Sequence, residues 1–154
     1  MSDVRFDGRV AVITGAGGGL GKSHALEFAK RGAQVVVNDL GGSVDGQGSG
    51  SSAADVVVKE IEEAGGTAVA NYDSVATKAG GEAIIQTAMD NFGQVDIVIN
   101  NAGILRDKSF AKMSEDEMTL VLDVHLRGAF YVSQPAFRAM KERNYGRFVH
   151  TASA

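Results

Sequence analysis

The chain has 154 residues, 44% of them hydrophobic and 22% charged, which suits a single domain built around one hydrophobic core. The absence of cysteine excludes a disulfide framework and a thiolate metal site, and we expect no bound metal. The net charge of −4 argues against nucleic acid as a partner, and no apolar run reaches the roughly 20 residues needed to span a membrane, so we expect a cytoplasmic protein.

Hydrophobic periodicity predicts strands that alternate with helices along the chain. The strands are short and apolar, as in Val35–Val37, whereas the helices carry apolar residues at helical spacing. In chain order we predict a strand over 9–14, a helix over 19–31, a strand over 33–38, a helix over 53–64, a strand over 67–71, a helix over 78–92, a strand over 95–99, a helical region over 114–143 and a strand over 147–151.

Specific residues mark several of these boundaries. Gly32 and Gly93 directly follow helical stretches, where glycine supplies the left-handed conformation that ends a helix. Ser114–Glu117 has the sequence of a capping box and opens the long helical region, which Pro135 is predicted to kink or interrupt. The Gly- and Ser-rich stretch over 41–52 is predicted to be an exposed loop.

Strands that are apolar on both faces indicate a parallel sheet covered by helices on each side. Because crossovers between parallel strands are right-handed, we predict an α/β fold, a doubly wound parallel sheet of the Rossmann type with strand order 3-2-1-4-5. The pattern stops after the fifth strand, which would leave that strand as an exposed edge.

A glycine-rich turn, TGAGGGLG over 14–21, joins the first strand directly to the first helix. A diphosphate needs close approach to the backbone, and the helix N-terminus favours its negative charge. Gly15 permits the turn, whereas Gly19 and Gly21 permit close approach and tight helix packing. We therefore predict cofactor binding by Gly15, Gly19, Leu20 and Gly21, the alternative being a glycine-rich turn without a ligand.

Asp39 ends the second strand at the distance from the glycine turn that a ribose-binding carboxylate requires. Its carboxylate would accept hydrogen bonds from both hydroxyls of the adenosine ribose and would repel a 2′-phosphate. Gly17 and Gly18 bring no basic side chain to offset that repulsion. The sequence therefore favours NAD over NADP, and the alternative is a solvated acid at a strand end.

The glycine turn, together with Asn100-Asn101-Ala102-Gly103 after the fourth strand, resembles the short-chain dehydrogenase/reductase family. The resemblance is closest to the branch that holds the (3R)-hydroxyacyl-CoA dehydrogenase domain of peroxisomal multifunctional enzyme type 2 and its bacterial relatives. The segments that carry this closer resemblance are NDLGG over 38–42, ANYDSV over 70–75, NNAGILRD over 100–107 and VHLRG over 124–128.

The resemblance implies further cofactor contacts. On the adenine side, Asp73 would meet the amino group of the base, and Val75 would line its pocket with Ser74 between them. The alternative for Asp73 is a polar residue at a strand end. On the nicotinamide side, three consecutive residues would lie under the ribose and steady the fourth strand: Asn101, Ala102 and Gly103. Side-chain hydrogen bonds within a turn are the alternative role for Asn101.

The resemblance also implies hydride transfer coupled to proton transfer at the substrate oxygen, with a Tyr as acid and base and a Lys that lowers its pKa. Ser153 falls at the family's substrate-binding serine, and His125 at the position of a proton-relaying Asn. The named branch also resembles this chain in having His there. A strand-end hydroxyl and a packed helical residue are the respective alternatives. None of the three tyrosines is followed by Lys four residues later.

We therefore expect residues 1–154 to be the N-terminal, NAD-binding part of a short-chain dehydrogenase domain of about 250 residues or more. The expected reaction is oxidation of (3R)-hydroxyacyl-CoA to 3-ketoacyl-CoA in fatty-acid or sterol side-chain β-oxidation. A steroid or acyl-carrier-protein-linked dehydrogenase and a non-catalytic NAD-binding module are the alternatives. We expect a homodimer or homotetramer at full length, and a peroxisomal location if the source is eukaryotic. The helical region would then bare apolar residues: Leu120, Val121, Val124, Ala129, Phe130, Val132 and Phe137.

Overall fold

The computed structural model describes residues 4–41 and 52–152. In chain order the elements are β1 (Val10–Thr14), α1 (Gly19–Lys30), β2 (Gln34–Asn38), α2 (Ser52–Glu63), β3 (Thr67–Asn71), α3 (Lys78–Phe92), β4 (Ile97–Asn100), a short 3-10 helix η1 (Phe110–Lys112), α4 (Glu115–Leu122), a π-helical turn η2 (Asp123–Arg127), α5 (Gly128–Glu142) and β5 (Arg147–His150). Most of 41–52, predicted as an exposed loop, lies outside the described residues.

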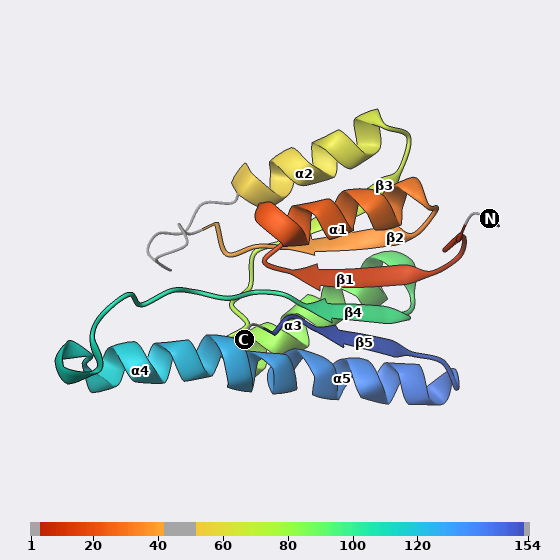
Figure 1. Cartoon of the computed structure of the whole chain (residues 1–154). Helices are drawn as coiled ribbons and strands as arrows, with labels where there is room; N and C mark the ends of the chain where they lie inside the picture. The colour runs from red at the N-terminus through yellow and green to blue at the C-terminus, as the bar shows by residue number, and fades with distance from the viewer. Residues whose placement is uncertain (1–3, 42–51, 153–154) are drawn as a thin grey trace.

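Within the described ranges, five parallel strands form one sheet in the order β3-β2-β1-β4-β5, which confirms the predicted topology. Helices α1 and α2 cover one face of this sheet, and α3, α4 and α5 lie on the other (Figure 1). Because the chain turns back from β3 to β4, the connections that leave β1 and β4 run to opposite faces. Such a reversal opens a crevice at the carboxyl ends of the strands.

The apolar runs of the strands divide between two buried clusters within the described residues. In β1, Ala11 and Ile13 face α1 and α2, whereas Val10 and Val12 face α3 and α5. All four side chains are fully buried. Strands in this position are apolar at every residue because both of their faces are covered.

The helical region over 114–143 is interrupted, but not at Pro135. The capping box at Ser114 is present, and Pro135 lies inside α5 without ending it. The break is instead the π-helical turn η2. Pro135 has no N–H to donate to the carbonyl of Tyr131, and Gly81 of α3 packs against that carbonyl, where a Cβ would collide with it. The proline therefore sits where α3 and α5 approach closely.

Apolar side chains remain exposed along the continuous helical stretch formed by α4, η2 and α5, here called the α4–α5 rod. The most exposed of them follow one helical face: Met118, Leu122, Leu126, Phe130 and Phe137. Of the residues that the sequence placed on this bare face, Val132 is instead fully buried against the second core cluster. No helix in the described part of the chain is long and apolar enough to cross a membrane.

Candidate functional site

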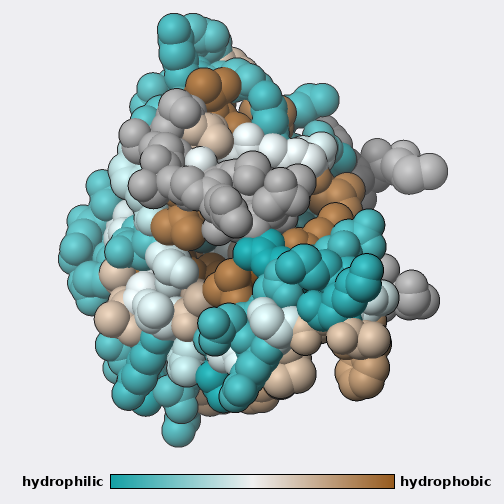
Figure 2. Space-filling model, turned by 90° about the vertical axis from the view of Figure 1, so that its left-hand side faces the viewer, coloured by the Kyte–Doolittle hydropathy of each residue, from teal (hydrophilic) through white to brown (hydrophobic). Residues whose placement is uncertain are grey.

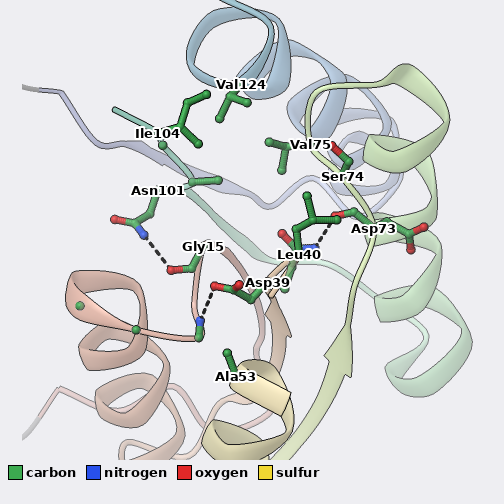
Figure 3. Close-up of a pocket in the computed structure, with 16 residues that line it drawn as sticks. Gly15, Asp39, Leu40, Ala53, Asp73, Ser74, Val75, Asn101, Ile104 and Val124 are labelled. Atoms are coloured by element: carbon green, nitrogen blue, oxygen red, sulfur yellow. Dashed lines mark hydrogen bonds between the residues drawn. The ribbon is translucent and has the colours of Figure 1, made fainter. Parts of the chain in front are cut away.

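A cleft with a volume of about 390 Å³ lies at the carboxyl edge of the sheet. The segments that follow β1, β2, β3 and β4 line it, together with Ala53 at the start of α2 and Val124 of η2. Figure 2 looks onto this edge, where apolar surface lies among hydrophilic groups, and Figure 3 shows the lining residues. The cleft therefore occupies the crevice that the strand order opens.

The glycine-rich turn forms one side of the cleft. Gly15 and Gly19 have φ values of +62° and +52°, which L side chains rarely adopt. A Cβ on Gly15 would also lie 2.8 Å from the Cα of Ala102 in the loop after β4. Helix α1 has Gly18 at its N-cap position, so no side chain caps it, and its first turn holds no acid. Its first main-chain amides are therefore available to donate hydrogen bonds to an anion.

The carboxylate of Asp39 is fixed by two main-chain amides. Its Oδ2 accepts a hydrogen bond of 2.8 Å from Gly17, and its Oδ1 accepts one of 2.8 Å from Gly41. A carboxylate has roughly four acceptor positions, so each oxygen keeps one for a hydroxyl. A Cβ on Gly17 would lie 2.8 Å both from the carboxyl carbon of Asp39 and from the methyl of Ala53. The sequence did not reveal this contact, since it depends on where α2 begins.

Thr14 and Asn101 join the glycine turn to the loop after β4. The buried Oγ1 of Thr14 accepts the N–H groups of Asn101 and Ala102, at 3.1 and 3.0 Å. In return, the side-chain amide of Asn101 donates to the carbonyl of Thr14 at 3.1 Å and to that of Gly15 at 3.2 Å. Figure 3 shows the bond to Gly15. A Cβ on Gly21 would lie 2.6 Å from that amide nitrogen. Gly21 therefore packs behind the turn.

Residues 73–75 form the side of the cleft that follows β3. The Asp73 carbonyl accepts a hydrogen bond of 2.9 Å from Asn38, and its Oδ2 accepts one of 2.8 Å from Asn71. Both asparagines are buried, and Asn38 also donates to Asn71 at 2.8 Å. Figure 3 shows the Asp73 carboxylate turned away from Leu40 and the cleft. The main chain of this segment, with Val75, therefore faces the space predicted for adenine.

His125 lies on the π-helical turn and holds the loop after β4. Its Nε2 lies 3.0 Å from the Ile104 nitrogen and 2.9 Å from the Ile104 oxygen. The tautomer of the ring decides whether this nitrogen accepts from the first or donates to the second. A Cβ on Gly103 would lie 2.8 Å from Cε1 of the ring. His125 therefore packs directly against this loop.

A smaller cavity of about 40 Å³ lies next to the cleft, between η2 and the end of β5. His125, His150 and Thr151 contribute to its lining. The ring of His150 lies 3.2 Å from the side-chain amide of Asn100. Ser153, which was predicted to bind substrate, lies outside the described residues.

The structure brings most of the predicted cofactor-binding residues to one cleft: Gly15, Gly19, Asp39, Asp73, Ser74, Val75, Asn101, Ala102 and Gly103. Leu20 and Gly21 do not line it, because Leu20 is 64% exposed on α1 and Gly21 is buried behind the turn. Leu40, Ile104 and Ala53 line the cleft but were not predicted to do so. Among the described residues, no three His, Asp or Glu side chains converge to hold a metal ion.

Comparison with known proteins finds extensive similarity. The sequence profile of the family described as short chain dehydrogenase matches residues 9–154. The chain is 62% identical over 151 residues to peroxisomal multifunctional enzyme A of Dictyostelium discoideum, covering 98% of this chain and 34% of that protein. It is 58% identical over 153 residues to peroxisomal multifunctional enzyme type 2 of Mus musculus, covering 99% of this chain and 20% of that protein.

Among solved structures, a 7α-hydroxysteroid dehydrogenase complexed with NADH and 7-oxo glycochenodeoxycholic acid is similar, with a TM-score of 0.87 and 34% sequence identity. That similarity covers 97% of this chain and 55% of the steroid dehydrogenase chain. The chain thus spans only part of the length of each of these relatives.

Proposed function

Since the chain belongs to the short-chain dehydrogenase family, we propose that it forms the NAD-binding part of an oxidoreductase that oxidises (3R)-hydroxyacyl-CoA to 3-ketoacyl-CoA. The observation that carries the NAD assignment is the Asp39 carboxylate, which two main-chain amides fix beside the cleft. A fixed negative charge there accepts ribose hydroxyls and repels a 2′-phosphate.

The cleft would accept a dinucleotide because Gly18 and Gly19, which line it, have open space where a Cβ would stand. The uncapped start of α1 would hold the diphosphate, and Asp39 the adenosine ribose. Residues 73–75 would contact adenine, and 101–103 the nicotinamide-side ribose. The bound cofactor would supply an acceptor for the hydride that leaves the substrate carbon. The residues of this chain hold the dinucleotide and set the position of its two ends.

Two further roles at the nicotinamide end are part of this proposal. The hydroxyl of Ser153 would hydrogen-bond the reacting oxygen of the substrate. His125 would help to relay the proton released there, beside the loop that it already contacts through Ile104. The smaller cavity next to His125 is large enough for a water molecule and has polar side chains in its lining, which such a relay requires.

The names of the relatives support the choice of substrate. Two of them are peroxisomal multifunctional enzymes, and a further relative, 59% identical over 151 residues, is named peroxisomal hydratase-dehydrogenase-epimerase. We therefore place this reaction in fatty-acid or sterol side-chain β-oxidation, in peroxisomes if the source is eukaryotic. A steroid alcohol is the rival substrate, favoured by the similarity to the 7α-hydroxysteroid dehydrogenase.

The decisive experiment measures NADH formation by the full-length protein with four substrates offered separately. These are (3R)- and (3S)-hydroxyacyl-CoA, a hydroxyacyl group on acyl carrier protein, and a steroid alcohol. We expect turnover with the (3R)-hydroxyacyl-CoA and NAD, and little with NADP. Reaction of the steroid or carrier-protein substrate alone would replace the substrate assignment. Cofactor binding without turnover of any substrate would favour a non-catalytic NAD-binding module.

We also propose that the full-length protein forms a homodimer or homotetramer. The support is the exposed apolar row on the α4–α5 rod, which includes Phe130 and Phe137 at 69% and 58% exposure. Exposed apolar surface of this kind marks contacts with other protein surfaces. Analytical ultracentrifugation of the full-length protein tests this proposal, and a monomer at all concentrations would refute it.

A further inference from the structure

A hydrogen bond outside the cleft joins two of the segments that line it. The phenol of Tyr72 donates to Oδ1 of Asp55. Tyr72 directly precedes residues 73–75, and Asp55 lies in the first turn of α2, close after Ala53. Neither Tyr72 nor Asp55 is among the described residues that line the cleft. The bond therefore links two sides of the cleft from outside it, on the exposed surface of the protein.

Ala53 is the residue through which α2 reaches the cleft. A Cβ on Gly17 would meet the Ala53 methyl and the Asp39 carboxyl carbon, each at 2.8 Å. These three residues are therefore packed against one another, and the Gly17 amide also donates to the Asp39 carboxylate. A shift of the first turn of α2 would change the space available to that carboxylate.

Other contacts hold the body of α2. Val57 and Ile61 are buried in the first core cluster, and Glu60 pairs with Lys22 of α1 at 2.6 Å. These contacts fix the helix against the sheet and against α1. The bond between Tyr72 and Asp55 is different, because it fixes the first turn of α2 to the segment that leaves β3.

The charge of the acceptor strengthens this bond, since hydrogen bonds to a carboxylate are stronger than those between neutral groups. The hydrogen bond to Asp55 raises the pKa of Tyr72 above its ordinary value of 10.0, and burial and the charge of Asp55 act in the same direction. The phenol therefore remains a donor throughout the neutral range.

We propose that Tyr72 is a positioning residue for the adenosine half of the cofactor, because its bond to Asp55 sets the spacing between the start of α2 and the segment after β3. This inference rests on the proposed NAD site. Loss of the bond loosens the first turn of α2, although Ala54 in that turn stays buried in the first core cluster. Through Ala53 and Gly17, this change loosens the carboxylate of Asp39. The expected signature is weaker cofactor binding with unchanged turnover at saturating NAD.

Calorimetry on the full-length protein, with NAD and with ADP as probes, tests this role. We expect Tyr72→Phe to raise the Kd of both probes about fivefold and to raise KM for NAD without changing kcat. Asp55→Ala should have the same effect, and the double variant should lose no more than either single one. Asp55→Asn keeps an acceptor oxygen but loses the charge, so its affinity should fall between those of the wild type and Asp55→Ala.

The matched control is Glu60→Gln, on the same helix as Asp55, which removes the ion pair between Glu60 and Lys22 of α1. It should leave both Kd values unchanged. Wild-type affinity in Tyr72→Phe would overturn the inference and leave the proposed function standing. An equal loss in Glu60→Gln would also overturn it, because helix stability in general would then set the affinity. A wild-type protein that binds neither probe would overturn the proposed NAD site itself.

Discussion

Replacing Thr14 by valine tests how strongly the glycine turn depends on the loop after β4. Valine has nearly the shape of threonine but lacks the hydroxyl, so the N–H groups of Asn101 and Ala102, at 3.1 and 3.0 Å from Oγ1, lose their acceptor. A buried donor left without an acceptor costs about 1–3 kcal/mol. Both hydrogen bonds are partly buried, so each loss falls in the lower part of that range. We expect the free energy of unfolding to fall by about 2–3 kcal/mol.

Urea unfolding of the full-length protein measures this loss, since a shifted midpoint at constant m reports a change in stability. Thr14→Ser is the control, because it keeps the hydroxyl and loses one methyl, at a cost of about 1 kcal/mol. The valine variant should also bind NAD more weakly, because Asn101 then holds Gly15 less firmly. If Thr14→Val proves at least as stable as Thr14→Ser, the hydroxyl does not support the two amides and the reasoning fails.

Three further predictions concern the carboxylate of Asp39, the glycine turn and the start of α4. Asp39→Asn keeps the size of the side chain and removes its charge. Calorimetry should then show an NAD affinity about tenfold lower and a smaller preference for NAD over NADP. An unchanged preference for NAD would contradict the role of Asp39 in binding the ribose. Gly21→Ala places a Cβ against the main chain of the turn and should lower the free energy of unfolding, measured in urea, by about 1–3 kcal/mol. The control is Gly18→Ala, whose added Cβ would have no atom within 4 Å, and it should change that free energy by less than about 0.5 kcal/mol. A hydrogen bond from Lys108, with others from the capping box, lowers the pKa of Glu117 from 4.5 to about 2. The contribution of this carboxylate to the stability of the folded protein is therefore complete above pH 4.5 and is lost as the pH falls toward 2. The melting temperature of Glu117→Gln should therefore fall less steeply than that of the wild type as the pH is lowered over this range. Parallel declines in the two proteins would show that this carboxylate has no such effect.

The order of the elements could be predicted because its signals are local, and the strand order followed from the right-handed crossovers of a doubly wound sheet. Apolar runs mark buried strands, and glycine marks the helix end at Gly93, where φ is +72°. The start of β4 was placed too early, because Val95 is apolar and buried but lies outside the strand. The break in the long helical region could not be predicted. Pro135 lies inside α5, where the Tyr131 carbonyl that lacks its donor packs against Gly81 of α3. The π-helical turn at 123–127 has no local sequence signal.

Part of the cleft could also be predicted from spacing alone. Asp39 and Gly15 follow strands that end at the same edge, so their proximity follows from the topology. The contacts of Ala53 could not be predicted, because they depend on how α2 packs after a stretch of unpatterned sequence. The orientation of the Asp73 carboxylate likewise depends on Asn71, whose burial only the packed structure reveals.

The two neighbours of β1 are synthesised at different times. β2 follows it closely in the chain, whereas β4 lies beyond two further helices and β3. At translation rates of roughly 5–20 residues per second, one edge of β1 stays open on the ribosome for several seconds. During that interval Gly15 also lacks the Asn101 amide that holds its carbonyl. The nascent chain therefore completes the glycine turn only once residue 101 has emerged, so binding of the proposed cofactor would be a late event in biogenesis.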